Sequence, residues 1–269
     1  MLLKTFELTK QKNNLSLKVI ISGASSGIGK ALAKEYSKNG AILGLISRRK
    51  NVLQELKKEL PNSCFIYALD VNDIKACQSM ANDFIMHVGV PDIVIANAGI
   101  SHGTLTEYYD DLTTFQQIIK TNLFGTVNLF QPFVGLFKSR KKGSFVGISS
   151  VAGIRGLPGA SAYSASKSAL SNYLEALRIE LSEFNISVIN IAPGYIESAM
   201  TAANPYSMPF IMKVDEAAKK IIHAIYLKKK FIIIPWQMAV IGKIMHMLPV
   251  SIWDWLAKRS PRKPRKIEN

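Results

Sequence analysis

The sequence predicts one α/β domain built on a doubly wound, mostly parallel seven-stranded sheet, with helices on both faces and a C-terminal helical extension. Short apolar runs rich in β-branched residues alternate with longer helical patterns between residues 18 and 234, which is typical of β-α-β units. Glycine or polar residues directly follow several of these runs, where parallel sheets bind their ligands. A chain of 269 residues is long enough to bury one such core.

The order of the predicted elements implies right-handed crossovers between parallel strands. Strands are predicted at residues 18–21, 41–47, 64–68, 93–96, 144–148, 187–191 and 231–234. Helices are predicted at residues 30–38, 51–60, 73–87, 112–130 or beyond, from about 163 to 184, 238–248 and 251–257. The main domain is therefore expected to cover residues 1–234, and the extension residues 235–269.

Composition favours a folded globule, because 48% of the residues are apolar. The net charge of +15 is spread over the chain, with basic clusters at residues 48–50, 140–142, 228–230 and 258–266. No nucleic-acid-binding motif accompanies this charge, so no nucleic-acid partner is predicted. A solvated basic surface, an anionic membrane or an acidic ligand stay open as explanations.

The cysteine pattern and the N-terminal residues indicate in which cellular compartment the protein is expected. Cys64 and Cys77 lack metal-ligand spacing, so no metal site is expected and both thiols are predicted to be buried and reduced. Residues 1–17 show no secretory signal, and no apolar run reaches the ~18 residues of a membrane-spanning helix. A cytoplasmic location is expected, with contact at a membrane surface as an alternative.

The first strand runs directly into a glycine-rich segment and then into a helix. Residues 22–29 read Ser-Gly-Ala-Ser-Ser-Gly-Ile-Gly. Glycines let a backbone approach a pyrophosphate, and the helix N-terminus supplies N–H groups and a positive dipole end. The segment therefore predicts a dinucleotide-phosphate loop, with cofactor-binding residues Gly23, Ser25, Ser26, Gly27, Ile28 and Gly29.

The second strand ends in Arg48 and Arg49, where an NAD-binding unit would place a carboxylate for the ribose. A guanidinium there suits a 2′-phosphate, which it binds with paired hydrogen bonds. NADP is therefore favoured over NAD. Solvated arginines at a helix start remain the alternative.

Ser150, Tyr163 and Lys167 have the chemistry of a carbonyl/alcohol site. Lys167 lies one helical turn after Tyr163, on the same face, and is expected to lower the pKa of the phenol toward neutrality. Ser150 precedes Tyr163 by 13 positions (163 minus 150) across a Gly/Pro-rich loop. Tyr-x-x-x-Lys alone is a weak signal. Its weight comes from the predicted strand ends, since Gly23, Arg48, Asp70, Asn97 and Ser150 all follow strands.

Several ordered motifs over residues 18–227 together resemble the short-chain dehydrogenase/reductase family, in its NADP-preferring type. The loop at 22–29 resembles that family's Thr-Gly-x-x-x-Gly-x-Gly segment, and Arg48 its basic residue. Residues 96–99, Ala-Asn-Ala-Gly, stand for Asn-Asn-Ala-Gly. The resemblance implies a Rossmann fold, oxidoreductase activity, a homodimer or homotetramer, and a catalytic tetrad of Asn122, Ser150, Tyr163 and Lys167.

The resemblance also assigns further residues to the cofactor. It implies cofactor contacts for Arg49, Asp70, Val71, Asn97, Ala98, Gly99, Tyr163, Lys167, Pro193, Gly194, Ile196 and Ser198. In reduction, hydride would pass from the nicotinamide to a carbonyl carbon while Tyr163 protonates the oxygen. Ser150 would position that oxygen, Lys167 would bind the nicotinamide ribose, and Asn122 would anchor a water leading to Lys167. Asparagine is a poor mid-helix residue, which already indicates a polar task.

The substrate and the C-terminal extension are less determined. Residues 198–213 are expected to cover the substrate, and their Met, Phe and Ile content favours a hydrophobic carbonyl or alcohol. Residues 238–257 are apolar and Trp-bearing, and a basic tail predicted to be mobile follows them. A peripheral membrane anchor, a subunit interface and a cap over the pocket stay open. The competing functions are a catalytically idle cofactor-binding protein and a membrane-associated scaffold.

Overall fold

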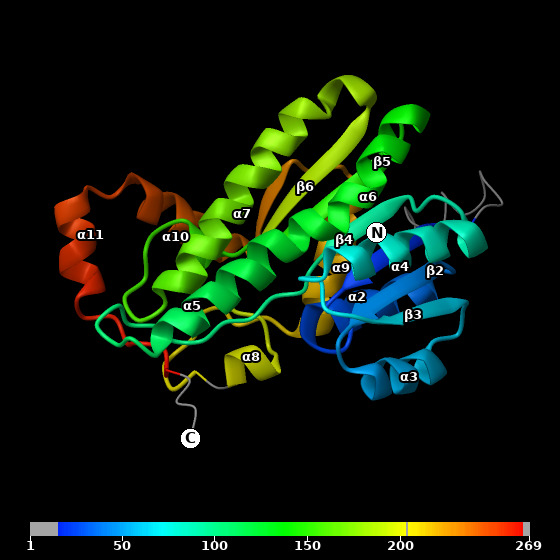
Figure 1. Ribbon diagram of the computed structural model, residues 1–269. Helices are drawn as coiled ribbons and strands as arrows, with labels where there is room; N and C mark the ends of the chain where they lie inside the picture. The colour runs from blue at the N-terminus through cyan, green and yellow to red at the C-terminus, as the bar shows by residue number, and fades with distance from the viewer. Residues whose placement is uncertain (1–15, 203, 266–269) are drawn as a thin grey trace.

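The computed structural model describes residues 16–202 and 204–265 (Figure 1). Its seven strands form one sheet in the order β3-β2-β1-β4-β5-β6-β7, and every pairing is parallel. The strands are β1 (Lys18–Ser22), β2 (Ile42–Ser47), β3 (Cys64–Ala68), β4 (Ile93–Ala96), β5 (Gly143–Ile148), β6 (Ile186–Pro193) and β7 (Phe231–Ile234). The predicted doubly wound sheet is confirmed, and it is parallel throughout.

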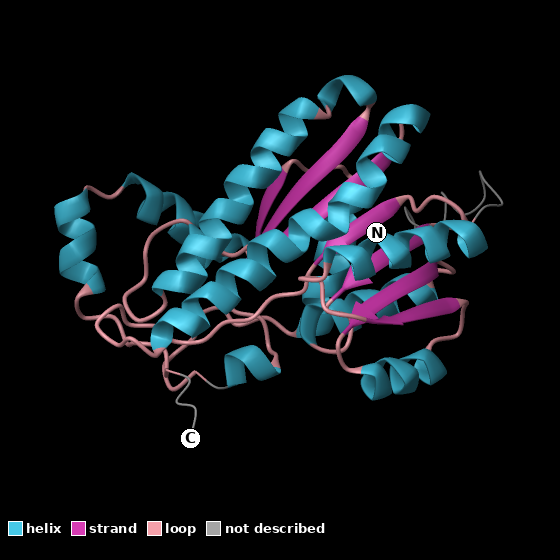
Figure 2. Ribbon diagram, viewed as in Figure 1, coloured by secondary structure: helices cyan, strands magenta, loops and turns pink. Residues whose placement is uncertain are grey.

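Helices cover both faces of this sheet (Figure 2). They are α2 (Gly27–Lys38), α3 (Lys50–Glu59), α4 (Ile74–Val88), α5 (Asp111–Ile119), α6 (Gly125–Arg140), α7 (Ser161–Glu180), α8 (Ala199–Ala202), α9 (Val214–Tyr226), α10 (Trp236–Met247) and α11 (Val250–Ala257). The helix predicted over residues 112–130 is interrupted by a π-helical turn at Lys120–Phe124. That turn contains Asn122.

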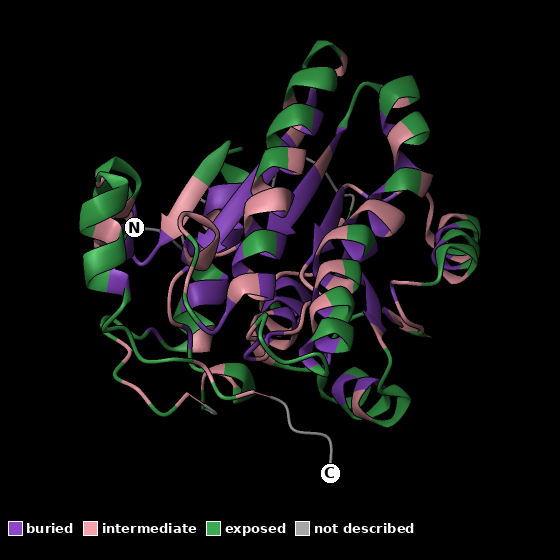
Figure 3. Ribbon diagram, turned by 60° about the vertical axis from the view of Figure 1, so that its left-hand side comes forward, coloured by how far each residue is buried: buried purple, intermediate pink, exposed green. Residues whose placement is uncertain are grey.

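The core consists of two apolar layers, one on each face of the sheet. Val19 and Ile21 of β1 pack with α2, α3 and α9, whereas Ile20 packs with α4, α6 and α7. This division follows from the alternation of side chains along a strand. Figure 3 shows the buried strands between helices whose outer faces are exposed. Each large aliphatic side chain so buried stabilises the fold by about 1.5–3 kcal/mol, which fixes the strand ends that carry the site.

The C-terminal extension leaves the sheet after β7 and then returns to it. Helices α10 and α11 lie to one side of the body, and residues 258–265 run back toward α5 (Figure 1). The basic tail was predicted to be mobile, and that prediction is wrong for Lys258 to Arg265. The Gly103 N–H donates a hydrogen bond of 2.9 Å to the carbonyl of Pro264, and Arg265 pairs with Asp111.

Two expectations fall partly or wholly outside the described residues. The reading of the N-terminal segment concerns residues 1–15, and the end of the basic tail concerns residues 266–269. Within the described part of the chain, no helix is both long enough and apolar enough to cross a bilayer. The division into residues 1–234 and 235–269 stays a prediction.

Candidate active site

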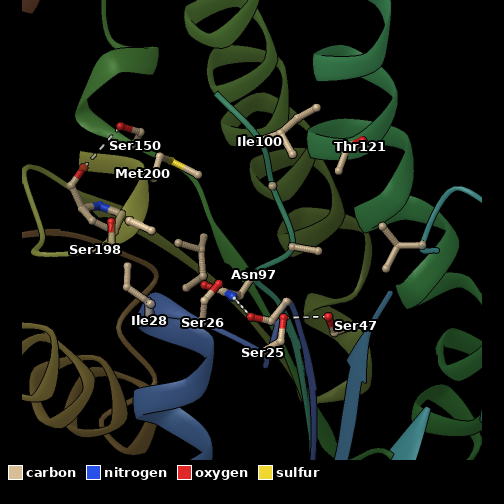
Figure 4. A pocket seen from close by; sticks show the side chains of 18 of the residues that line it. Ser25, Ser26, Ile28, Ser47, Asn97, Ile100, Thr121, Ser150, Ser198 and Met200 are labelled. Atoms are coloured by element: carbon tan, nitrogen blue, oxygen red, sulfur yellow. Dashed lines mark hydrogen bonds between the residues drawn. The ribbon is translucent and has the colours of Figure 1, made fainter. Parts of the chain in front are cut away.

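A cleft lies at the carboxyl ends of the central strands (Figure 4). Its volume is about 470 Å³, within the usual range of small-molecule sites. Nineteen of the predicted residues line it: Gly23, Ser25, Ser26, Gly27, Ile28, Arg48, Arg49, Asp70, Val71, Asn97, Ala98, Gly99, Ser150, Tyr163, Lys167, Pro193, Gly194, Ile196 and Ser198. The other two predicted residues, Gly29 and Asn122, do not line the cleft but lie behind the residues that do.

The glycine loop is held by close backbone packing. A Cβ atom on Gly29 would lie 2.3 Å from the Gly23 carbonyl oxygen, so only glycine fits between loop and helix. Gly23 itself has a φ of 66°, a left-handed conformation that favours glycine. The Asn97 amide donates hydrogen bonds to the carbonyls of Ser22 and Gly23, at 3.0 and 3.3 Å. Asn97 therefore braces the loop from β4.

Basic side chains lie beside the same loop. The Arg49 guanidinium donates hydrogen bonds of 2.8 Å to the hydroxyls of Ser25 and Ser26, and Ser25 also pairs with Ser47 at 2.7 Å (Figure 4). The Arg48 guanidinium lies 3.7 Å from the Asp70 carboxylate and is mostly exposed. Two guanidiniums and three hydroxyls thus converge where β1 and β2 end, a donor set suited to a phosphate.

Tyr163, Ser150 and Lys167 meet at the other end of the cleft. The Ser150 side chain lies near the Tyr163 phenol and acts on its pKa. Its hydroxyl donates a hydrogen bond of 3.4 Å to the Pro193 carbonyl and accepts one of 3.1 Å from the Ala152 N–H. The Lys167 ammonium lies 5.8 Å from the centroid of the Tyr163 ring. It donates a hydrogen bond of 2.8 Å to the carbonyl of Ile148. One turn of α7 therefore places both side chains beside the end of β5.

The electrostatics of this group differ from the sequence-based expectation. Burial raises the pKa of the Tyr163 phenol, while the neighbouring Ser150 side chain acts in the lowering direction. Burial also lowers the pKa of Lys167 to about 8. Both effects follow because an apolar surrounding disfavours the charged form of either group. The expected net lowering of the Tyr163 pKa is therefore not seen in this structure.

Asn122 is fully buried behind the cleft. Its amide group exchanges two hydrogen bonds with the backbone of Ile100, at 2.8 and 3.0 Å, and donates a third to the Ser166 hydroxyl at 2.9 Å. A Cβ atom on Gly99 would lie 3.1 Å from the Asn122 carbonyl oxygen and 3.5 Å from the Lys167 ammonium. Asn122 thus holds the segment after β4 against α7, next to Lys167.

The predicted cover lies over the cleft from β6 onward. Pro193, Gly194 and Ile196 line the wall, and Ile196 forms an isolated parallel bridge with Met212. Met200, in α8, also lines the cleft. An ionised Tyr206 phenol would raise the pKa of Tyr163, so this segment comes near the catalytic tyrosine. Residue 203 lies outside the described residues.

Sequence reasoning missed several residues of the site. Ser47, Leu69, Ile100 and Thr121 also line the cleft, whereas Met200 and Thr201, which line it too, belong to the predicted cover at residues 198–213. Ser47 and Leu69 each adjoin a predicted site residue, so the strand-end rule could have found them. Ser101 and Lys263 lie 162 positions apart and are joined by a hydrogen bond of 2.8 Å. No sequence spacing signals such a contact.

Comparison with known proteins identifies the class to which this fold and site belong. Residues 17–207 match the family model described as short chain dehydrogenase. The chain therefore belongs to the short-chain dehydrogenase/reductase family and is an NAD(P)-dependent oxidoreductase, as the sequence predicted.

Individual relatives place the chain within this family. An uncharacterized oxidoreductase of Myxococcus xanthus is 34% identical over 243 residues, which cover 89% of this chain and 96% of the relative. The 11-beta-hydroxysteroid dehydrogenase-like 2 protein of Arabidopsis thaliana is 34% identical, over 88% of this chain and 79% of its own. A solved short-chain dehydrogenase from Sphingobium yanoikuyae, in complex with NADPH, has a TM-score of 0.73 at 22% identity, covering 90% of this chain and 92% of that one. This last likeness concerns the fold.

Proposed function

We propose that the protein interconverts a carbonyl group and a primary or secondary alcohol on a hydrophobic substrate, with NADP(H) as cofactor and Tyr163 as general acid/base. The observation that carries the proposal is the grouping of Ser150, Tyr163 and Lys167 at one end of a cleft that also contains the glycine loop. A phenol held by a second hydroxyl in a buried site can donate a proton to an oxygen bound between them.

The chain's own residues then have distinct tasks. NADPH, when bound, would supply the hydride for the carbonyl carbon. Tyr163 donates its phenolic proton to the carbonyl oxygen, and Ser150 holds that oxygen by a hydrogen bond. Lys167 stabilises the resulting phenolate and binds the nicotinamide ribose. Asn122 keeps the wall beside Lys167 in place and anchors a water there, so that a proton can return to Tyr163.

NADP is favoured over NAD by the groups at the end of β2. Arg49, Ser25 and Ser26 already form a connected donor set, and Arg48 adds a second positive charge nearby. Among proteins of similar fold, the Sphingobium enzyme holds NADPH, whereas a reductase from Brucella melitensis holds NADH. NAD therefore stays the alternative cofactor.

A hydrophobic substrate is supported by the segment over the cleft. Met200, Phe210 and Ile211 are each 40–49% exposed, although large apolar side chains usually gain by burial. A bound apolar molecule would cover them. Related proteins carry hydroxysteroid dehydrogenase and 3-ketoacyl-(acyl-carrier-protein) reductase names, which also denote substrates with large apolar parts.

Loss of NADPH absorbance at 340 nm, with a panel of apolar ketones, aldehydes and 3-oxoacyl thioesters, tests this function. We expect turnover with at least one class, and a kcat lower by about 10²–10⁴-fold after Tyr163→Phe. Tight NADPH binding without turnover of any class would instead favour an idle cofactor-binding protein. Homodimer or homotetramer formation stays a prediction, which light scattering of the purified chain tests.

We also propose that helices α10 and α11 rest on an anionic membrane surface. They expose Trp236, Val240, Ile244, Met247, Val250, Ile252, Trp255 and Leu256. Exposed cations, Lys243, Lys258 and Arg259, accompany this apolar face, and the Arg259 guanidinium stacks 4.4 Å from the Trp255 ring. Apolar helices with flanking cations suit the interface of a bilayer that contains anionic lipid.

Co-sedimentation with phosphatidylglycerol-containing vesicles tests the membrane contact. Ile244→Glu should abolish binding, because it places a carboxylate in the apolar face. Met86→Glu is the matched control, since Met86 is also an exposed apolar residue but lies on α4. Equal sedimentation of both variants and the unaltered chain would disprove the contact.

A further inference from the structure

The C-terminal segment docks on the body beside Tyr163. The Arg265 guanidinium donates a hydrogen bond of 2.8 Å to the carboxylate of Asp111, which is almost completely buried. The same guanidinium lies 3.5 Å from the centroid of the Tyr108 ring. Arg265 also holds the pKa of the Asp111 carboxyl below its usual range, so this pair stays ionised at neutral pH.

The body is shaped to receive this segment. A Cβ atom on Gly103 would lie 2.3 Å from the carbonyl oxygen of Lys263, and one on Gly159 would lie 2.8 Å from the Arg262 side chain. Thr104, which follows Gly103, forms an isolated β-bridge with Ala160, and its hydroxyl accepts a hydrogen bond from the Ala162 N–H. The tail is therefore packed directly against the start of α7, the helix that carries Tyr163.

This docking brings a second cation, besides Lys167, to the catalytic tyrosine. The Lys263 ammonium lies 5.9 Å from the centroid of the Tyr163 ring, and it donates a hydrogen bond of 2.8 Å to the Ser101 hydroxyl. The side chain is half-buried. Within residues 16–202 and 204–265, no carboxylate forms an ion pair with the Lys263 ammonium. Asp111 is paired with Arg265.

We propose that Lys263 is a specificity-determining residue, which pairs with a carboxylate on the substrate while Tyr163 acts on the carbonyl. The inference rests on the proposed function and adds the substrate class: an oxo-carboxylate, or the corresponding hydroxy acid, with an apolar body. The Lys263 ammonium has two N–H donors beyond the one used by Ser101. A partly buried cation without an anionic partner gains more from such a pair than an exposed one does.

The neighbouring cations do not offer the same interaction. Lys167 is buried and bonded to the Ile148 carbonyl, and the proposed mechanism uses it for the phenolate and the cofactor ribose. Arg265 is occupied by Asp111. Burial lowers the pKa of Lys263, and a bound carboxylate would raise it again by favouring the charged form. Lys263 is therefore the cation at Tyr163 best placed to receive a substrate anion.

A matched pair of ketones tests the proposal. The probes are 4-acetylbenzoate and its neutral methyl ester, which share the reacting carbonyl and the ring. We compare kcat/KM for NADPH oxidation in the unaltered chain, Lys263→Met, Lys263→Arg and Lys258→Met. Lys258→Met removes the same charge from an exposed residue of the same tail, and is the control for general electrostatic steering.

Lys263→Met should lower the carboxylate-to-ester ratio of kcat/KM by about 10- to 100-fold, the value of a charge-assisted hydrogen bond. Lys263→Arg should retain most of the ratio, and Lys258→Met should leave it unchanged. An unaltered ratio in Lys263→Met, or an equal fall in Lys258→Met, overturns the proposal.

Equilibrium binding separates this inference from the proposed function. Both probes are titrated into the NADPH-bound chain while cofactor fluorescence is followed. If neither ketone is reduced, carboxylate binding that is lost only in Lys263→Met still supports the anion site, although the proposed reduction has failed for these ketones. Equal binding of the carboxylate by Lys263→Met and the unaltered chain overturns the anion site.

Discussion

Removal of both arginines after β2, Arg48→Ala with Arg49→Ala, should convert a preference for NADPH into indifference or a preference for NADH. In the structure the Arg49 fork is already held by Ser25 and Ser26, so little side-chain entropy is lost when a 2′-phosphate binds. Arg48 lies beside Asp70, and its side chain is 69% exposed. Both arginines line the cleft, so both guanidiniums could contact a bound 2′-phosphate.

The magnitude follows from one charge-assisted hydrogen bond per arginine. Each such bond contributes about 1.5–3 kcal/mol. Because both side chains are exposed, screening by water and salt favours the lower limit, so the pair contributes about 3 kcal/mol in total. This corresponds to about a 100-fold increase in the Kd of NADPH. NADH lacks the 2′-phosphate, so its Kd should change by less than about threefold.

The assay is fluorescence titration of each cofactor at fixed ionic strength. Lys50→Ala is the control, since Lys50 is also basic and exposed but begins α3 outside the cleft. The single variants divide the loss between Arg48 and Arg49. An equal loss of NADPH and NADH affinity in the double variant would refute the assignment to the 2′-phosphate, because both cofactors share every other group.

Three other variants test the site. Tyr163→Phe should lower kcat by about 10²–10⁴-fold, the usual contribution of a general acid, with an unchanged Kd for NADPH. Lys167→Met should also be inactive, yet more stable at pH 7. Burial lowers the Lys167 pKa from 10.5 to about 8. Between pH 8 and pH 10.5 the Lys167 amine is therefore protonated in the unfolded chain but neutral in the folded chain. Stability should therefore rise from pH 8 to 10.5 in the unaltered chain relative to Lys167→Met, as measured by urea unfolding. Gly103→Ala should release the tail, which faster hydrogen exchange of the residue 103 amide, bonded to the Pro264 carbonyl in the docked state, reports.

The sheet, its order of elements and most of the cleft were predictable from the sequence. Parallel strands buried on both faces read as short apolar runs, and their carboxyl ends share one edge of the sheet. The residues directly after β1, β2, β4 and β5 were therefore assigned to one site without any knowledge of packing. Asn97 shows the limit of this rule, because its side chain braces the glycine loop.

The features that sequence reasoning missed depend on contacts between distant segments. The π-helical turn at Asn122 follows from hydrogen bonds to Ile100 and Ser166, which no local propensity indicates. The direction of the Tyr163 pKa was also missed, because the depth of burial outweighs the effect of one lysine at 5.8 Å. The run of basic residues after α11 predicted a mobile tail because charged segments usually repel one another. A single buried acid, Asp111, changes that outcome.

The docked tail also changes how the basic character of the chain is understood. A net charge of +15 is costly for a compact chain through self-repulsion, and the tail places two of those charges, Lys263 and Arg265, against the active-site side of the body. Arg265 has an acid to offset its charge, whereas Lys263 has a hydroxyl. Met200 lines the cleft and is 40% exposed, so an apolar ligand there would gain from contact with it. A substrate with an apolar body and a carboxylate end would contact the apolar side chain and pair with the Lys263 ammonium. A neutral hydrocarbon ketone would leave the ammonium unpaired, and a small polar acid would leave the apolar side chain exposed.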